Sequence, residues 1–127
     1  MRTNIPSPAL AAVGFAALAA AQSVVPSASG FNYLECAVEP FDNGLSNTRA
    51  LHGASMVLLN NMTVEQCGAF CKSGSFNYMG VEYGSECYCG NQLSQGTTLD
   101  TSGGCNAPCA GSSAELCGGS GRMNLYS

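Results

Sequence analysis

The sequence has no tryptophan, a single histidine and little charge: four basic and eight acidic side chains give a formal net charge of −4 over 127 residues. Beyond Arg2, the only basic residues are Arg49, Lys72 and Arg122. So low a density of basic residues provides no basic patch, which argues against nucleic acid and against an anionic membrane surface as partners. Neutral ligands fit this composition better than charged ones.

No apolar run is long enough to span a bilayer, which takes about 20 residues. The single long apolar stretch, residues 9–21, is rich in alanine, follows the basic Arg2 and ends in three alanines. This pattern is typical of a secretory signal peptide. We therefore predict a signal peptide over residues 1–21, cleaved after Ala21. The mature protein would have no transmembrane segment and would be secreted to the extracellular space or the cell wall. A flexible alanine-rich tail is the alternative.

All eight cysteines lie in the predicted mature chain. An even, high count in a short secreted chain predicts a disulfide framework without a free thiol. A core this small needs cross-links, and losing one native disulfide typically costs about 2–5 kcal/mol. The length indicates one domain, which we place at residues 31–127 behind a short, mobile N-terminal tail, residues 22–30.

Two cysteine pairs in the middle of the chain organise the predicted fold. Cys67 and Cys71 are four residues apart, which is about 6 Å along a helix. Cys87 and Cys89 are two apart, which is about 6.6 Å along a strand and on the same face. A helix can therefore lie along a strand with both pairs joined by disulfides. Parallel alignment pairs Cys67 with Cys87 and Cys71 with Cys89, antiparallel alignment exchanges the partners, and spacing does not decide between them.

Local patterns predict one helix among short strands. Thr63 and Gln66 form a capping box that begins a helix over residues 64–72. Strands are expected at residues 31–36, 76–81, 86–90 and 122–126, residues 56–59 are a strand or a buried connection, and residues 40–48 and 92–104 are loops. Met123 and Leu125 should face inward, and Gly80 marks a bulge or the close approach of another backbone. These elements predict a small disulfide-rich α+β domain, with a short helix packed on an antiparallel sheet and four disulfides.

A modification signal lies just ahead of the predicted helix. Asn61 stands in the only N-glycosylation sequon of the chain, Asn-Met-Thr. The position before a helix N-cap is expected to be exposed, so Asn61 is the candidate glycosylation site.

Four motifs together resemble the WSC domain family. They are Arg49-Ala-Leu51, the Cys67-x3-Cys71 helix, the block from Gly80 to Asn91, and the cysteine loop from Cys105 through Cys117 to Gly119. The resemblance covers roughly residues 31–126 and includes all eight cysteine positions. Glu35 is a departure, because the family usually has glycine before the first cysteine. The family occurs in fungal cell-wall stress sensors, secreted fungal proteins and appended modules of fungal enzymes. The sensors also carry a Ser/Thr-rich stalk and a transmembrane helix that this sequence lacks, so a sensor role is not implied.

This resemblance implies a carbohydrate-binding module for polysaccharides such as β-glucan or xylan. It also implies the disulfides Cys36–Cys105, Cys67–Cys87, Cys71–Cys89 and Cys109–Cys117. That pairing agrees with the parallel alignment of the helix and the strand.

Sugars bind to proteins through ring faces stacked on aromatic side chains and through hydroxyls paired with amides and carboxylates. Because tryptophan is absent, tyrosine must supply the aromatic platform. The candidate ligand-binding residues all lie in or beside the cysteine-bearing hairpin: Tyr78, Tyr83, Tyr88, Glu82, Glu86 and Asn91. Tyr83, in a turn, is the leading candidate, and Tyr88 alternates with Cys87 and Cys89, so it points away from them and could form an exposed platform. The plainer interpretation is that Tyr78 and Tyr88 cover the core, as Tyr33 and Tyr126 are expected to do near the termini.

Catalytic and metal-binding interpretations have less support. Glu82 and Glu86 could serve as a glycosidase pair only with about 5–10 Å between the carboxyls and one raised pKa. A small disulfide-rich domain offers no deep cleft, so solvated carboxylates are expected instead. His52 has no free thiol to activate and is expected to be a loop residue. The cysteines could mimic a zinc site, but export favours disulfides.

The predicted function is therefore non-catalytic binding of cell-wall or plant polysaccharide, of the β-glucan or xylan type, without enzyme activity, cofactor or metal. The alternative is a secreted protein-interaction factor, either an effector or a self-associating wall component. It would use the same tyrosine-rich surface.

Overall fold

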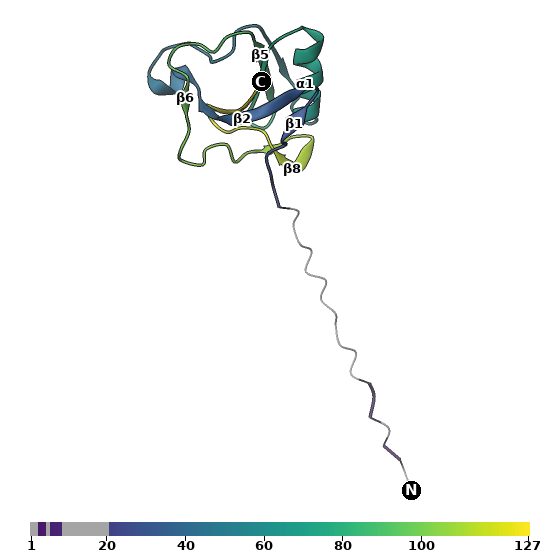
Figure 1. Cartoon of the computed structure of the whole chain (residues 1–127). Helices are drawn as coiled ribbons and strands as arrows, with labels where there is room; N and C mark the ends of the chain where they lie inside the picture. Colours follow the sequence, from purple (N-terminus) through teal and green to yellow (C-terminus); the bar gives the residue numbers. More distant parts are fainter. Residues whose placement is uncertain (1–2, 5, 9–20) are drawn as a thin grey trace.

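The structure of the chain, a computed structural model, describes residues 3–4, 6–8 and 21–127 (Figure 1). The predicted signal peptide therefore lies mostly outside the described residues. Within the described ranges, no helix is long and apolar enough to cross a membrane.

An antiparallel sheet of seven strands forms the centre of the molecule. Its main path runs β1-β2-β9-β4-β5-β3, and β6 pairs with β2 beside that path. The strands are β1 (Ser27–Ala28), β2 (Phe31–Val38), β3 (Ala54–Val57), β4 (Tyr78–Glu82), β5 (Glu86–Gly90), β6 (Thr98–Leu99) and β9 (Arg122–Tyr126). Strands β7 (Pro108–Cys109) and β8 (Ser112–Leu116) form a separate hairpin. The predicted α+β class is confirmed, and β4 and β5 form the predicted hairpin.

The helix α1 (Val64–Ser73) begins where the capping signal places it. The side-chain oxygen of Thr63 accepts a hydrogen bond from the Gln66 backbone N–H at 3.1 Å, which satisfies one of the N–H groups that the first turn leaves free. The buried side of the helix faces β4 and β5. Gly68 lies on the buried side next to β1, and a Cβ there would lie 3.2 Å from Ala28, a tight contact that β1 would have to relieve by a small shift.

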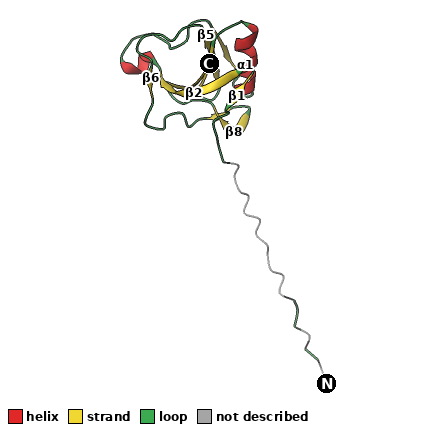
Figure 2. Ribbon diagram, in the orientation of Figure 1, coloured by secondary structure: helices red, strands yellow, loops and turns green. Residues whose placement is uncertain are grey.

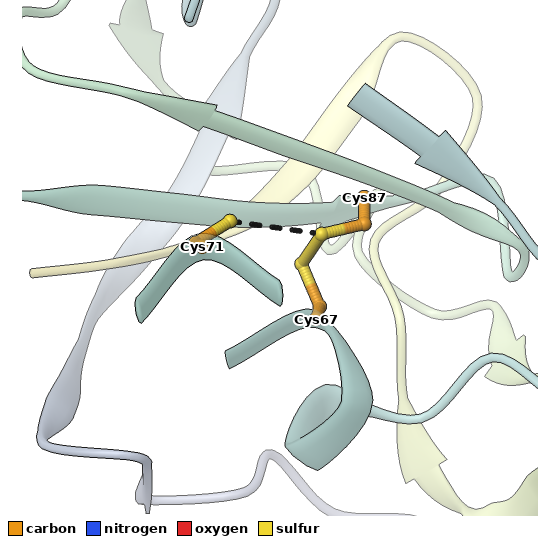
Figure 3. Close-up of side chains that lie close together, drawn as sticks. All are labelled: Cys67, Cys71 and Cys87. Atoms are coloured by element: carbon orange, nitrogen blue, oxygen red, sulfur yellow. Dashed lines mark hydrogen bonds between the residues drawn. A yellow bond between two sulfur atoms is a disulfide. The ribbon is translucent and has the colours of Figure 1, made fainter. Parts of the chain in front are cut away.

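Two neighbouring disulfides join α1 to β5. Cys67 is bonded to Cys87 and Cys71 to Cys89, so the helix and the strand run parallel, and the Sγ atoms of Cys71 and Cys87 lie 3.7 Å apart (Figure 3). The other two disulfides are Cys36–Cys105 and Cys109–Cys117, which confirms the family pairing. The sulfurs of Cys67, Cys71 and Cys87 are close enough to mimic a metal site, but each is in a disulfide, and no free thiol occurs among the described residues.

The alternation of side chains gives the sheet two buried faces. Met79, Val81 and Tyr126 face α1. Tyr33 and Tyr126 are packing residues, as predicted, and their rings meet edge-on at 5.4 Å. Met123 and Leu125 are buried on the opposite face, which we call the second face.

Gly80 provides space on this second face. The expectation of a bulge or a close backbone is wrong, because the close neighbour is a side chain. A Cβ at Gly80 would collide with the sulfur of Met123 on the adjacent strand β9.

The N-terminal segment, residues 22–30, is part of the fold, and the expectation of a mobile tail is wrong. Ser23 donates its backbone N–H to Ala114 at 3.0 Å, and β1 pairs with β2. The Tyr126 hydroxyl donates to the Val25 carbonyl at 2.8 Å. Figure 1 shows β1 beside α1, where Ala28 is buried. Apolar side chains in this segment cover the edge of the core, which is why it docks.

The segment from Glu39 to Gly53 covers the second face of the sheet. It contains the short 3-10 helix η1 (Pro40–Asn43), which was expected to be irregular loop. Figure 2 shows α1 and the small helical turn at opposite sides of the domain, with the turn next to β6. Ala50 donates its backbone N–H to the buried Glu39 carboxylate at 2.7 Å, and Leu51 is buried against Tyr88 and its neighbours.

Candidate functional site

A row of three open hollows follows the covering segment across the second face. The first, about 400 Å³, is lined by residues that include Arg49, His52, Ser55 and Tyr88. The second, about 280 Å³, shares His52 and continues to Asn91. The third, about 330 Å³, shares Arg49 and is completed by Phe41 and Asn47. Neighbouring hollows share lining residues and therefore lie side by side, and we call the three together the Arg49 groove.

Strand alternation and one glycine explain how this groove forms. Tyr88 lies between two disulfide-bonded cysteines of β5, so its side chain points to the face opposite α1, and Ser55 of β3 pairs directly beside it. Gly53 brings the covering segment onto β5, where its N–H donates to the Cys89 carbonyl at 2.7 Å. A Cβ at Gly53 would collide with the Phe76 ring and lie 2.8 Å from that carbonyl. The close crossing therefore requires glycine.

Arg49 lies where the first and third hollows meet. Its Nη1 lies 3.2 Å from Oε2 of Glu82 and 3.6 Å from Oε1 of Glu39. Its guanidinium carbon lies 4.3 Å from the centre of the Tyr88 ring and 5.3 Å from that of Phe41. Such cation–π contacts are favourable, especially where water is partly excluded. Two carboxylates and two rings therefore hold the guanidinium in one orientation.

Glu82 is buried beneath Arg49, with only 3% of its surface exposed, so the expectation of a solvated carboxylate is wrong. Burial, followed by the hydrogen bond and the charge of Glu39, raises the pKa of Glu82 to about 9, although Arg49 acts in the opposite direction. At neutral pH, Glu82 is therefore protonated. Glu39, Arg49 and protonated Glu82 then carry no net charge together, because one carboxylate balances one guanidinium.

Tyr88 is 8% exposed, so the expectation of an exposed platform is wrong and the core-covering interpretation is confirmed. Its ring packs with Leu51 and Leu125, and Tyr78 lies against the same cluster. The Tyr88 hydroxyl donates to Oε1 of Glu86 at 2.7 Å. Burial and this hydrogen bond both raise the pKa of the Tyr88 hydroxyl.

Tyr83 lies in the turn between β4 and β5 and is 65% exposed. Its φ of +53° is rare for a residue with a side chain. The next residue anchors the turn, because Gly84 exchanges backbone hydrogen bonds of 2.9 Å with Cys117 and Ala110. The Tyr83 side chain is therefore free to contact a ligand, although its backbone is held.

The residues predicted to bind ligand do not form a single site. Glu82, Glu86 and Tyr88 share the second face, whereas Tyr83 lies at the turn. Asn91 follows the opposite end of the hairpin, where it lines the second hollow and accepts the Asn77 N–H at 3.0 Å.

Sequence reasoning missed the main groove residues. It used Arg49 only as part of a family motif, considered His52 only as a catalytic residue, and treated Phe41 as loop. The scarcity of basic residues was the available signal for Arg49, because an isolated arginine inside a family motif needs a structural or binding role.

These features define a small α+β domain that is cross-linked by four disulfides and carries an open groove of aromatic, guanidinium, hydroxyl and amide groups. The WSC domain family model matches residues 33–119, and the chain belongs to this family. The family is one of candidate carbohydrate-binding modules. A disulfide-rich domain of this kind is consistent with an extracellular location.

Three relatives illustrate how the domain is distributed. The "Putative fungistatic metabolite" of Chaetomium globosum is 47% identical over 78 residues, which cover 61% of this chain and 35% of that protein. A WSC domain-containing protein of Arthroderma benhamiae is 39% identical over 101 residues, covering 80% of this chain and 13% of that protein. Kremen protein 1 of Homo sapiens is 37% identical over 70 residues, which cover 53% of this chain and 14% of that protein. The chain thus matches only a minor part of each relative.

Proposed function

We propose that this chain is a secreted, non-catalytic carbohydrate-binding module that holds polysaccharide of the β-glucan or xylan type in the Arg49 groove. The observation that carries the proposal is the row of adjacent, open hollows along the covering segment. An open depression made of several hollows suits a chain of sugars better than a single small molecule.

The chemistry of the groove matches the surface of a sugar. Pyranose rings present apolar C–H faces and a rim of hydroxyls. Tyr88 and Phe41 supply ring edges, and Arg49, Ser55 and Asn91 supply polar groups along the rim. His52 lies at the junction of two hollows, where it can contact sugars on either side.

The proposal excludes glycoside hydrolysis for a structural reason. A raised pKa such as that of Glu82 can mark a general acid. A general acid must reach the glycosidic oxygen, however, and Glu82 lies buried beneath the Arg49 guanidinium. Glu86, the possible second carboxylate of a catalytic pair, already accepts a hydrogen bond from the Tyr88 hydroxyl. Both carboxylates therefore act as structural groups in this proposal.

A protein-interaction role is the second candidate, and a separate observation favours it. Tyr83 and Leu59 are 65% and 75% exposed, and Val57 is exposed as well. These residues lie near one end of the hairpin, because Leu58 donates its N–H to Ser85 in the same turn. Exposed apolar groups of this kind can bind protein as readily as sugar.

Retention on insoluble polymers tests the proposal. The oxidised protein should be retained on β-1,3-glucan or xylan, with chitin and cellulose as comparison polymers. We expect His52→Ala to reduce retention several-fold and Tyr83→Ala to leave it nearly unchanged. Both residues are exposed, so the two variants are matched for effects on folding.

Other outcomes separate the alternatives. Loss of retention in Tyr83→Ala alone would move the sugar site to the turn. A wild-type protein that binds none of the four polymers would contradict carbohydrate binding and leave the protein-interaction role.

A further inference from the structure

The hydrogen-bonding groups of Arg49 are only partly used within the protein. Nη1 faces Glu39 and Glu82, whereas Nε and Nη2 have no hydrogen-bond partner among residues 21–127. The side chain is more than one-third exposed and lines two of the three hollows. A ligand in the groove can therefore accept hydrogen bonds from a guanidinium that is already held in place.

The charge of this guanidinium is already balanced. Glu39 is fully buried, and Ala50 donates to its Oε2, whereas Oε1 has no hydrogen-bond donor in the described part of the chain. A proton on Glu82 gives the Glu39 carboxylate that donor. Burying two ionised carboxylates beside one guanidinium would leave an uncompensated charge, which is costly in a protein interior. The favoured state of the three groups is neutral.

The next titratable group along the sheet is acidic. Glu86 accepts a hydrogen bond from Tyr88, whose ring lies under Arg49. Among the residues that line the three hollows, Arg49 is the only lysine or arginine. An anionic ligand would therefore meet a guanidinium that is already paired and a carboxylate nearby.

We propose that the Arg49 groove selects uncharged polysaccharide over chains that carry uronic acids, and that Arg49 acts there as a hydrogen-bond donor whose charge is cancelled by Glu39. This inference rests on the proposed function and names the class of sugar at the same site. Hydroxyl and ring oxygens of the sugar accept hydrogen bonds from Nε and Nη2 of Arg49. A uronate carboxylate gains no net attraction and is repelled by Glu86.

The test compares one sugar backbone with and without carboxylates. The full-length chain, with its disulfides formed, is titrated by calorimetry with β-1,3-gluco-oligosaccharides. It is then titrated with the same oligosaccharides after their C6 hydroxyls have been oxidised to carboxylates, which gives uronic acids. We expect the oxidised ligand to bind about fivefold more weakly, as one like-charge contact near a surface predicts. Binding of the neutral ligand should not change between about 0.05 M and about 0.5 M salt, because no net charge is neutralised.

Two variants and a control locate the effect. Glu86→Gln should bring the two affinities within about twofold of each other, since it removes the nearby negative charge. Glu65→Gln changes the net charge equally, but on the exposed side of α1, and should leave the ratio unchanged. Arg49→Lys should weaken neutral binding about tenfold, because it keeps the charge but loses the planar donor geometry.

Each result has a separate meaning. Equal or tighter binding of the oxidised ligand by the wild type would overturn the selectivity while leaving carbohydrate binding intact. An unchanged ratio in Glu86→Gln would also overturn it, even if Arg49→Lys failed to fold. Binding of neither ligand, by a protein that is also retained on none of the four polymers, would overturn the proposed function itself.

Discussion

Single residues at the centre of this domain have properties that depend on distant neighbours. Glu82 lies in contact with Arg49, 33 positions away in the sequence, and its pKa is set by burial and by Glu39. A glutamate beside a turn is normally solvated, and here it is buried and protonated. The two carboxylates and the arginine hold the covering segment, and with it the groove, onto the sheet.

The protonation of Glu82 predicts a dependence of stability on pH. Its pKa is about 9 in the folded state and 4.5 in the reference state, so the folded protein binds this proton more tightly. The stabilisation is therefore complete below pH 4.5 and is lost as the pH rises toward 9. Glu82→Gln mimics the protonated form and should make the free energy of unfolding less dependent on pH over that range. At about pH 9, the variant should be more stable than the wild type by at least about 1 kcal/mol.

Urea unfolding at about pH 5, about pH 7 and about pH 9 checks this expectation. Glu39, Arg49, Glu86 and Tyr88 face Glu82 and remain in both proteins, so the difference between them isolates Glu82. Parallel pH profiles for wild type and Glu82→Gln would contradict a protonated Glu82.

At the scale of elements, α1 shows how a short helix is held. A helix of this length is marginal when isolated. It is stabilised at its start by Thr63 and along its length by two disulfides to β5. Thr63 is also the third residue of the sequon at Asn61, so one side chain serves both the cap and the glycosylation signal.

Substitutions at Thr63 test the cap in protein that carries no glycan. In unglycosylated protein, Thr63→Ala should lower the free energy of unfolding by about 1 kcal/mol, because it removes the acceptor for the Gln66 N–H. Thr63→Ser keeps both the acceptor and the sequon and should be close to wild type. Chemical denaturation measures the stability. Equal stability of Thr63→Ala and Thr63→Ser would show that the cap is not needed.

Glycosylation of the exposed Asn61 remains a prediction. It would appear as a mass difference between the wild type and Asn61→Gln when both are produced in a eukaryotic host. Since Asn61→Gln leaves Thr63 in place, this comparison does not disturb the cap.

At the scale of the whole molecule, the disulfides link elements that have few other means of staying together. Cys36–Cys105 connects β2 to the long loop before β7, and Cys109–Cys117 closes the small hairpin. The loop is further held by Asp100, which accepts the Gly104 N–H at 2.7 Å and lies 3.4 Å from Nε of Arg122. Hydrogen bonds from Ser102 and Gly104 lower the pKa of Asp100 to about 2.

Reduction should therefore unfold the domain. Each disulfide contributes about 2–5 kcal/mol, and four together exceed the total stability of a typical small domain. The oxidised, denatured mature protein should show no thiol that reacts with Ellman's reagent. The reduced protein should lose its cooperative thermal transition by circular dichroism. Two or more reactive thiols before reduction, or a cooperative transition after it, would contradict this expectation.

Much of the fold could be predicted because it depends on neighbours in the sequence. Thr63 and Gln66 locate the start of the helix, and the spacing of Cys67, Cys71, Cys87 and Cys89 joins the helix to its strand. The alternation in residues 122–126 places Met123 and Leu125 on one face. Each pattern needs only the local periodicity of a helix or a strand. Spacing did not choose between parallel and antiparallel pairing, and the family resemblance supplied that choice.

The groove could not be predicted in the same way. Alternation correctly turns Tyr88 away from α1, but the covering segment, more than thirty residues earlier, is what buries it. The docking of residues 22–30 likewise depends on Ala114 and Tyr126, near the other end of the chain. Loop patterns do not specify such long-range contacts.

The disulfide-rich class, the capped helix and the hairpin follow from spacing and alternation alone, because these patterns act over a few residues. The meeting of Glu39, Arg49 and Glu82, the proton on Glu82 and the position of Tyr88 beneath a guanidinium all depend on long-range packing. Burial and pKa are set by which distant groups exclude water from one another, and that is a property of the packed chain.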